Sequence, residues 1–483
     1  MAWVIVGIPI LWGIWITLSK ALILFRRRGH PGAARQQNGA SMNAPTVARS
    51  ERTPFWSALF TDRRIAPAVG LGFTSGIPFL LVYATQSAWL SDIGISIATI
   101  GLLSELTLAY KFKFVWAPFL DRYDPPLFGR ALGRRRGWIV VAQLSVMAML
   151  AGIAFGDPAN WLAWTIAFSL ALGFAGATLD LVIDGWRITS VRPPEKQAVL
   201  SSWTEIGWRL GNLAAGAGAL FLADRIGWRG AYLGMGALMS VGMLAAVLAP
   251  EPPSDLRPHQ PRAGFVDTVW APIRELLTRL GPMAPAILLL IAGFRMPGYV
   301  ASAMAIPLFK HQGFSNTDIA TVTKLFGFWI GLGGTFLAGA LIPRIGMLPS
   351  LLIGTVAGSA SHLSLAYLAA HGGDGGAAFW TFAITVGIDG FAYAFASVVL
   401  ITYMSTLAST EHAASQFGLL TSLCAFPGSV LAGLSGFVVE RTGFTWFFVW
   451  TSLIGLPVAL LALYVWVKVG LSDEAAPQAA ANS

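Results

Sequence analysis

Apolar segments of about 20 residues recur along almost the whole chain, and this repetition limits the folds open to it. A helix needs about 20 apolar residues to cross the hydrocarbon core of a bilayer. The pattern predicts two sets of six such helices, separated by a polar linker. The first set is expected near residues 66–90, 97–120, 138–156, 161–187, 202–223 and 229–249, and the second near 284–309, 318–342, 348–370, 378–406, 415–438 and 443–468.

The composition agrees with a chain embedded in a membrane. Hydrophobic residues make up 55% of the 483 residues and charged residues 11%, whereas soluble proteins carry about 25% charged residues. The net charge of +9 comes from basic residues in short loops between apolar segments. There they set the orientation in a bilayer, so no nucleic-acid partner is expected. Cys424 is the single cysteine, which excludes an internal disulfide framework and a cysteine-based metal site.

The loop arginines predict the orientation of the spans. If the chain enters the first main span from the cytoplasm, the cytoplasmic loops hold the runs at 26–28 and 134–136. The outer loops then hold little beyond Arg225, Lys310 and Arg441. Because basic residues accumulate on the cytoplasmic side, the linker between the two sets is predicted to be cytoplasmic.

The same pattern divides the chain into five parts. These are an extra apolar segment with a basic linker at 1–64, a six-helix bundle at 65–249, a cytoplasmic linker at 250–283, a second bundle at 284–468 and a disordered tail at 469–483. The extra segment predicts an additional N-terminal transmembrane helix. In the alternative, Met42 is the true start and residues 1–41 are not native. The second part of the linker is amphipathic, as expected of a helix on the membrane surface.

A short motif recurs at matching places in the two sets. Residues 224–228 and 440–444 both have an acid, arginine, any residue, glycine and an aromatic residue. Asp121 and Arg122 have a weaker counterpart at Pro343 and Arg344. Duplicated halves are typical of alternating-access transporters. An all-α major facilitator fold of two six-helix bundles is therefore predicted.

Asp180, Asp184 and Arg187 introduce charge into a predicted span and share one helical face. Such groups usually line a wet path enclosed by protein. At about 1.5 Å per residue, Asp180, Lys113 and Arg209 come out roughly 10 to 12 Å from the cytoplasmic ends of their spans, and Glu205 roughly 6 Å. An ion network that gates the cytoplasmic mouth is predicted. The alternative is a set of permanent pairs that fixes helix packing.

Arg295 falls near the middle of its span, beside a helix break expected at Pro297 and Gly298. A central cation near freed backbone dipoles suits an anionic substrate group. The alternative is that Arg295 pairs with Glu105 or Asp389. Lys324 is predicted as a second anion contact, or else as a structural pair.

Glu105 and Asp389 are the remaining deep carboxylates and are candidates for carrying a proton. Alternatively, Lys111, Lys113 or Arg295 holds them ionised. Asp121 and Arg122 lie beside the arginine cluster at 134–136, which predicts a latch at the cytoplasmic rim in addition to an orientation signal. His362 is expected to be an ordinary buried histidine.

Several short motifs, in order and spacing, resemble those of the AmpG-type muropeptide permeases. They are Ala109–Tyr123, Gly133–Trp138, Asp180 with Asp184, Trp208–Gly211, Gly313–Ser315, Val322–Gly327 and Ser415–Phe417. The resemblance implies a major facilitator permease of the bacterial inner membrane, and the protein is separately expected to be a monomer. It implies import of anhydromuropeptides by proton symport, for peptidoglycan recycling. Among the residues that carry it or suit an anionic muropeptide, substrate contacts are expected from Arg295, Lys113, Lys324, Tyr110 and Gln416.

The chain departs from the family pattern at Leu179, at Glu105, Lys111 and Glu205, and after Arg295, where an expected acid is missing. These departures keep a different organic anion open, such as an acyl-CoA or a siderophore-like compound. A membrane assembly factor that transports nothing is a third hypothesis. An enzyme with Asp180 and Asp184 as metal ligands is disfavoured, because no histidine, glycine-loop or further acidic motif completes such a site, and no cofactor is expected.

Overall fold

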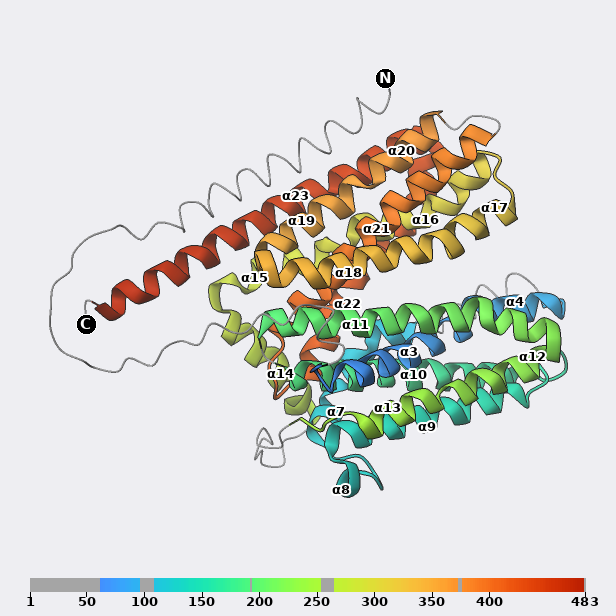
Figure 1. Ribbon diagram of the computed structural model, residues 1–483, viewed down its shortest axis with the longest axis horizontal. Helices are drawn as coiled ribbons and strands as arrows, with labels where there is room; N and C mark the ends of the chain where they lie inside the picture. Colours follow the sequence, from blue (N-terminus) through green and yellow to red (C-terminus); the bar gives the residue numbers. More distant parts are fainter. Residues whose placement is uncertain (1–60, 96–107, 192, 253–264, 372–375, 482–483) are drawn as a thin grey trace.

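A computed structural model describes residues 61–95, 108–191, 193–252, 265–371 and 376–481. The described chain is helical, and it forms two groups of long helices joined by α14 (Phe265–Leu280) (Figure 1). Ten of its helical stretches are long and apolar enough to cross a membrane. One of these, Pro194–Leu248, spans 55 residues and turns back at Gly227, so the predicted all-α fold of paired bundles is confirmed.

The N-terminal half contains the helices before α14. They are α3 (Ile65–Val82), α4 (Ala84–Asp92), α6 (Leu108–Phe112), the 3-10 turn η2 (Lys113–Val115), α7 (Ala117–Arg122), α8 (Gly129–Leu132), α9 (Arg134–Ala154), α10 (Leu162–Ser190), α11 (Pro194–Leu213), the π-helical turn η3 (Ala214–Gly218), α12 (Ala219–Leu238) and α13 (Ser240–Leu248).

The C-terminal half begins after α14 with a 3-10 turn, η5 (Gly281–Met283). Its further elements are α15 (Ala284–Phe294), α16 (Met296–His311), α17 (Asn316–Ala320), the π-helical turn η6 (Thr321–Phe326), α18 (Gly327–Ile345), α19 (Met347–Ala360), α20 (His362–His371), α21 (Gly376–Leu407), α22 (Ala413–Ala432) and α23 (Ser435–Ala481). The last helix ends at Ala481 and so includes most of the segment 469–483 that was predicted to be disordered. Five of these fifteen residues are alanine, the strongest helix former, and this favours continuation of α23.

Four glycines reverse the chain at equivalent places and make the internal repeat visible. Gly227 has φ 74° and ψ 167°, and Gly443 has φ 76° and ψ 165°. Gly133 and Gly346, which precede α9 and α19, have φ/ψ of 83°/175° and 89°/168°. Only glycine adopts this region readily. The motif found at 224–228 and 440–444 therefore marks a true structural repeat. The weaker pair of motifs, at 121–122 and 343–344, is followed in each half by one of the other two glycines, Gly133 and Gly346.

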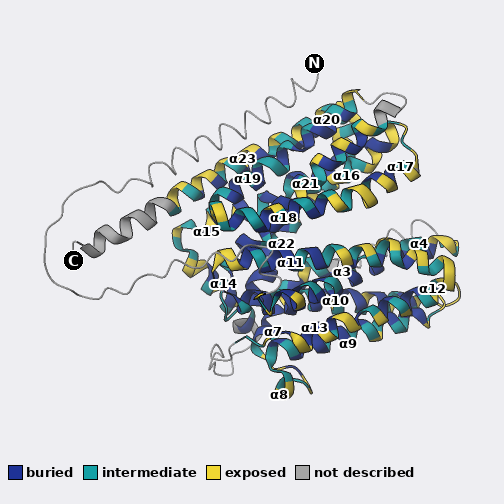
Figure 2. Ribbon diagram, in the orientation of Figure 1, coloured by how far each residue is buried: buried dark blue, intermediate teal, exposed yellow. Residues whose placement is uncertain are grey.

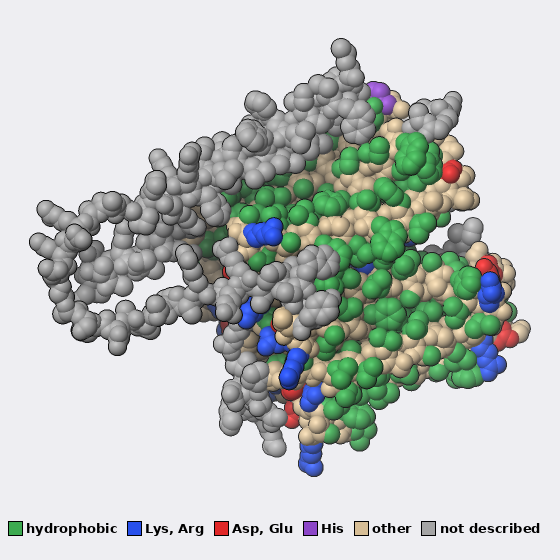
Figure 3. All heavy atoms as spheres, in the orientation of Figure 1, with side chains coloured by type: hydrophobic (Ala, Val, Ile, Leu, Met, Phe, Trp, Pro, Cys, Tyr) green, Lys and Arg blue, Asp and Glu red, His purple; other side chains and the backbone are tan. Residues whose placement is uncertain are grey.

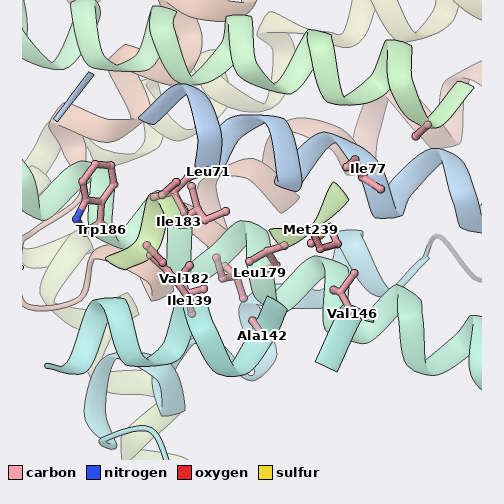
Figure 4. Close-up of a cluster of buried hydrophobic side chains, with 14 of the residues drawn as sticks. Leu71, Ile77, Ile139, Ala142, Val146, Leu179, Val182, Ile183, Trp186 and Met239 are labelled. Carbon is pink, nitrogen blue, oxygen red and sulfur yellow. The ribbon is translucent and has the colours of Figure 1, made fainter. Parts of the chain in front are cut away.

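The apolar core of the N-terminal half lies between α3, α9 and α10. Leu71, Ile139 and Leu179 are fully buried and point toward one another in Figure 4. Buried residues face inward in both halves, whereas exposed residues lie on the outer flanks (Figure 2). Those flanks carry large apolar side chains, such as Leu289 and Leu460 (Figure 3). An apolar outer surface of this extent belongs in a lipid environment, so the protein is a multi-pass membrane protein.

The two halves lie closest at the end that carries α7 and α14, here called the linker end, and diverge toward the end with α4 and α17 (Figure 1). Asp121 of α7 and Arg187 of α10 both hydrogen-bond to the C-terminal half near the linker end. The predicted span 3–25 lies outside the described residues, and so do residues 97–107 of the span predicted at 97–120, with Glu105, and residues 253–264 of the linker.

Helices α3 and α11 pack backbone to backbone through glycines. A Cβ added to Gly72 of α3 would lie 2.1 Å from the Thr204 carbonyl oxygen of α11. One added to Gly211 of α11 would lie 1.9 Å from the Phe73 carbonyl oxygen of α3. No side chain fits such a gap without a backbone shift, so these positions hold the two helices at their distance.

We expect Gly211→Ala to destabilise the folded protein by about 1 to 3 kcal/mol, because the added methyl forces α3 and α11 apart. The measurement is the midpoint of thermal unfolding in detergent. Gly436→Ala is the matched control, because nothing lies within 4 Å of a Cβ there. Equal midpoints for the two variants would contradict the packing argument.

Candidate functional site

A cavity of about 240 Å³ lies between the two halves. Three acids and three bases line it: Asp180, Asp184 and Glu205, with Lys113, Arg187 and Arg295. The wall from the N-terminal half comes from α3, η2, α10 and α11, and the facing wall from α16, α21 and α22 together with Arg295. The remaining lining residues are Ser75, Ile183, Ser201, Thr204, Trp208, Tyr299, Tyr393, Ser397, Ile401, Met404, Phe417, Thr421 and Cys424.

Asp180 and Lys113 form an ion pair across two helices of the N-terminal half. The Lys113 Nζ atom lies 3.7 Å from Asp180 Oδ2, and Ser75 of α3 donates a hydrogen bond to the other carboxylate oxygen. Lys113 stands at the point where the α6–α7 segment changes from α-helix to 3-10 turn. The pairing predicted between Asp180 and Lys113 is therefore present.

The predicted partnership of Asp180 with Arg209 is wrong in this conformation. Arg209 pairs instead with Glu205 on its own helix, at 3.4 Å. Helix α11 begins at Pro194, whereas the predicted distances from the cytoplasmic end placed its start near residue 201. Counted from the observed ends, Arg209 lies roughly 22 Å along its helix and Asp180 roughly 15 Å, whereas Lys113 comes to roughly 13 Å. Lys113 is thus level with Asp180 and Arg209 is not.

Arg187 forms the floor of the cavity and connects the halves. Its guanidinium donates to Asp184 at 2.9 Å, to Ser201 at 2.5 Å and to Ser405 of the opposite half at 2.8 Å. It also stands 5.2 Å from the ring centre of Phe417. The side chain is only 1% exposed. Arg187 was noted in the sequence only as a neighbour of the two aspartates, because its contacts across the halves join residues 218 positions apart.

Arg295 projects from the facing wall at the bend between α15 and α16. Its guanidinium donates to the Ser397 hydroxyl and lies 5.6 Å from the centre of the Tyr393 ring. Within the described chain, Asp389 is not its partner, because that carboxylate accepts from Ser361 at 2.8 Å and lies 3.9 Å from His362. His362 is buried, as expected. Arg295 therefore presents its charge to the cavity beside a hydroxyl and an aromatic ring.

Asp121 forms a buried junction between the halves at the linker end. Its carboxylate accepts from Arg135 at 2.8 Å, from the backbone N–H groups of Ala414 and Ser415 at 3.2 and 2.8 Å, and from the Ser415 hydroxyl at 2.5 Å. The two N–H groups belong to the start of α22, where the helix dipole favours a negative charge. Arg122 bonds to Thr268 of α14 at 2.8 Å. This set of contacts around Asp121 is called the latch below.

Three residues expected at the substrate site lie elsewhere. Gln416 is fully buried at the linker end, where its amide donates to Pro272 and Glu275 of α14 and accepts from Arg279 and from the Ser409 N–H. Lys324 is exposed on the turn η6, outside the cavity lining. The Tyr110 hydroxyl is buried against Gly176. Sequence position alone does not show which side of a helix faces the cavity, and that explains these three errors.

The aromatic and hydroxyl part of the cavity was not predicted from the sequence. Trp208, Tyr299 and Tyr393 line it together with Ser397. Their positions carry no charge inside an apolar span, so nothing in the pattern distinguished them from ordinary packing residues. Trp208 alone had a signal, since it belongs to one of the motifs that carry the family resemblance.

Comparison with known proteins is consistent with this geometry. The model of the Major Facilitator Superfamily matches residues 73–433. The anhydromuropeptide permease of Escherichia coli K12 is 32% identical over 420 residues, which cover 84% of this chain and 80% of the relative. Putative transporter AmpG 4 of Rickettsia felis is 27% identical, with coverage of 86% and 99%. The human organic anion transporter MFSD10 shares the fold, with a TM-score of 0.63 at 15% identity over 83% of this chain and 99% of that one.

We expect Asp121→Asn to open the linker end, because the variant loses the charge that pairs with buried Arg135. A buried charge-assisted hydrogen bond contributes about 1.5 to 3 kcal/mol, which corresponds to a shift of at least about tenfold toward the open form. The measurement is the rate at which a water-soluble maleimide labels Ala413→Cys, a position with 0% exposure beside the latch. The native Cys424 lines the cavity, so it is replaced by alanine in every protein that is labelled.

The matched control for this prediction is Asp124→Asn, an exposed acid three residues along the chain from the latch. It should leave the labelling rate unchanged. If Asp121→Asn labels no faster than the control, the latch does not stabilise closure of the linker end.

Proposed function

Because the chain belongs to the Major Facilitator Superfamily, and within it to the anhydromuropeptide permease family, we propose that it imports anhydromuropeptides across the bacterial inner membrane by proton symport. The proposal rests above all on the cavity between the halves. There Arg295 faces a wall lined by both acids and bases, but Arg295 itself forms no ion pair with an acid among the described residues. A muropeptide carries carboxylates and sugars, which suit a guanidinium flanked by aromatic rings and hydroxyls.

The conformation corresponds to the step at which an importer takes up its substrate. The basic loops predict that the linker end faces the cytoplasm, and the latch and Arg187 close that end. A cavity closed on the cytoplasmic side receives its substrate from outside. Rocking of the two halves about the cavity then releases it inside.

We assign three roles to residues of the cavity and the linker end. Arg295 binds a substrate carboxylate, with Ser397 and Tyr393 fixing its orientation. Lys113 and Asp180 form a charged pair that responds to binding. Arg187 and the latch form the cytoplasmic gate. The protein acts as a monomer in this proposal, since a single chain contains both walls of the cavity.

Uptake into proteoliposomes tests the function directly. Purified protein should accumulate a labelled anhydromuropeptide when the pH outside is lower than inside, and collapse of the gradient should abolish accumulation. Excess unlabelled muropeptide should compete, whereas an acyl-CoA and a siderophore should not. If only the acyl-CoA or only the siderophore competes, the substrate is that organic anion and not a muropeptide. Absence of any uptake would favour an assembly factor.

We expect Arg295→Gln to raise the KM for a muropeptide by about tenfold to a hundredfold, because charged hydrogen bonds to a carboxylate contribute about 1.5 to 3 kcal/mol. The matched comparison changes the substrate. Wild-type protein should discriminate against a muropeptide whose carboxylates are amidated, and Arg295→Gln should lose most of that discrimination. If both proteins discriminate equally, Arg295 does not bind the carboxylate.

A further inference from the structure

The segment Lys113–Arg122 joins the cavity to the latch. Lys113, at its first position, lies in the cavity lining and pairs with Asp180. Asp121, eight positions later, carries the latch. Counted along a helix, the two residues are separated by roughly 12 Å. One short stretch of chain therefore carries a charged cavity residue at one end and the closure of the cytoplasmic mouth at the other.

This segment is in contact with α22 of the opposite half. A Cβ added to Gly418 of α22 would lie 3.6 Å from Phe114 Cα and 3.7 Å from Ala117 Cβ, an ordinary van der Waals distance. The same helix supplies the N–H groups and the hydroxyl that hold Asp121. The segment therefore contacts one and the same helix near Lys113 and at the latch.

Asp180 differs from the other acids of the cavity in its partner. Asp184 and Glu205 pair with arginines, at 2.9 and 3.4 Å. Arginine keeps its charge and offers a planar set of donors, so each of these acids has a partner suited to a carboxylate. Asp180 pairs with a lysine, and the 3.7 Å separation exceeds the length of an ordinary hydrogen bond. This pair is the loosest of the three.

The groups around Asp180 define what a proton would change there. Ser75 of α3 donates to it, Lys113 of η2 is its cation, and Tyr110 of α6 lies within electrostatic reach. On its own helix, Asp184 is the nearest acid, and that acid is held by Arg187. A proton on the Asp180 carboxylate therefore cancels the acid that pairs with Lys113 among the described residues, and the Asp180–Lys113 pair goes from net zero to net +1.

We propose that Asp180 is the carboxylate that takes up the transported proton, and that Lys113 carries its effect to the Asp121 latch. This inference rests on the proposed function and specifies its coupling. When a proton binds an Asp180 oxygen, the Lys113 ammonium is freed to pair with a carboxylate of the substrate. Proton and anionic substrate then favour each other's binding, which is the reciprocity that symport requires. Movement of Lys113 shifts the segment along α22 and releases the latch.

Transport by Asp180→Asn tests the proton site. The variant should exchange labelled for unlabelled muropeptide across the membrane, yet fail to accumulate it under an inward proton gradient. Glu205→Gln is the matched control, because its acid pairs with an arginine; whatever its rate, its accumulation should still depend on the gradient. If Asp180→Asn accumulates muropeptide as the wild type does, the assignment of Asp180 is overturned. It is also overturned if Glu205→Gln loses its dependence on the proton gradient while Asp180→Asn keeps it.

Labelling of Ala413→Cys tests the connection to the latch, with no substrate present. In the otherwise wild-type protein, lowering the pH from about 8 to about 6 should raise the labelling rate several-fold relative to that of a free thiol at the same pH, a ratio that corrects for the smaller thiolate fraction at low pH. Asp180→Asn should label fast at both pH values. Lys113→Gln, which removes the charge, should abolish the pH response of the labelling rate, whereas Lys113→Arg, which keeps the charge, should retain it. If Lys113 only supported the local structure, its charge would not decide the pH response. A full pH response in Lys113→Gln would overturn the connection.

The two experiments separate the inference from the function on which it rests. Suppose that wild-type protein transports no muropeptide, but the pH response of Ala413→Cys labelling still depends on Asp180 and Lys113. The proposed substrate is then wrong, and the proposed coupling stands. If muropeptide uptake is normal and labelling ignores both residues, the function stands and the coupling is wrong.

Discussion

The cost of holding a charge away from water governs the arrangement of the cavity. An isolated charge near the centre of a bilayer costs at least about 3 kcal/mol. Each acid of the N-terminal wall accordingly stands next to a cation from its own half: Asp180 next to Lys113, Asp184 next to Arg187 and Glu205 next to Arg209. Arg295 on the facing wall has a hydroxyl and a ring as neighbours. The two walls therefore differ in charge, and in the proposed function an anionic substrate offsets that difference.

The same cost links closure of the linker end to the state of Asp121. The carboxylate is covered by α22, which also supplies two N–H groups and a hydroxyl to it. In the proposed function the halves separate at this end, and water replaces those donors. Asp121 then has hydrogen-bond partners in both conditions, so the latch would stabilise closure without preventing opening. A buried acid far from water would not allow such an exchange.

The sequence predicted the helices and their repetition well, because twenty-residue apolar segments and a recurring glycine motif are local properties. It also placed Asp180 and Lys113 at one level. It failed where the answer depended on the start of a helix or on the direction of a side chain. Arg209 was assigned to Asp180 because α11 begins earlier than the apolar pattern suggests. Gln416 belongs to a motif but turns toward α14, and only the packed structure shows that direction.

Rigid and yielding parts of the fold are distributed according to what each must do. Alternating access requires that each half keep its shape while contacts between the halves change. In the N-terminal half, α3 and α11 touch backbone to backbone through Gly72 and Gly211, a contact with little freedom. Two irregular places face the cavity instead: the 3-10 turn at Lys113 and the bend at Arg295. Helix hydrogen bonding is interrupted or weakened there, so these two charged residues are able to move without disturbing the helices that hold each half together.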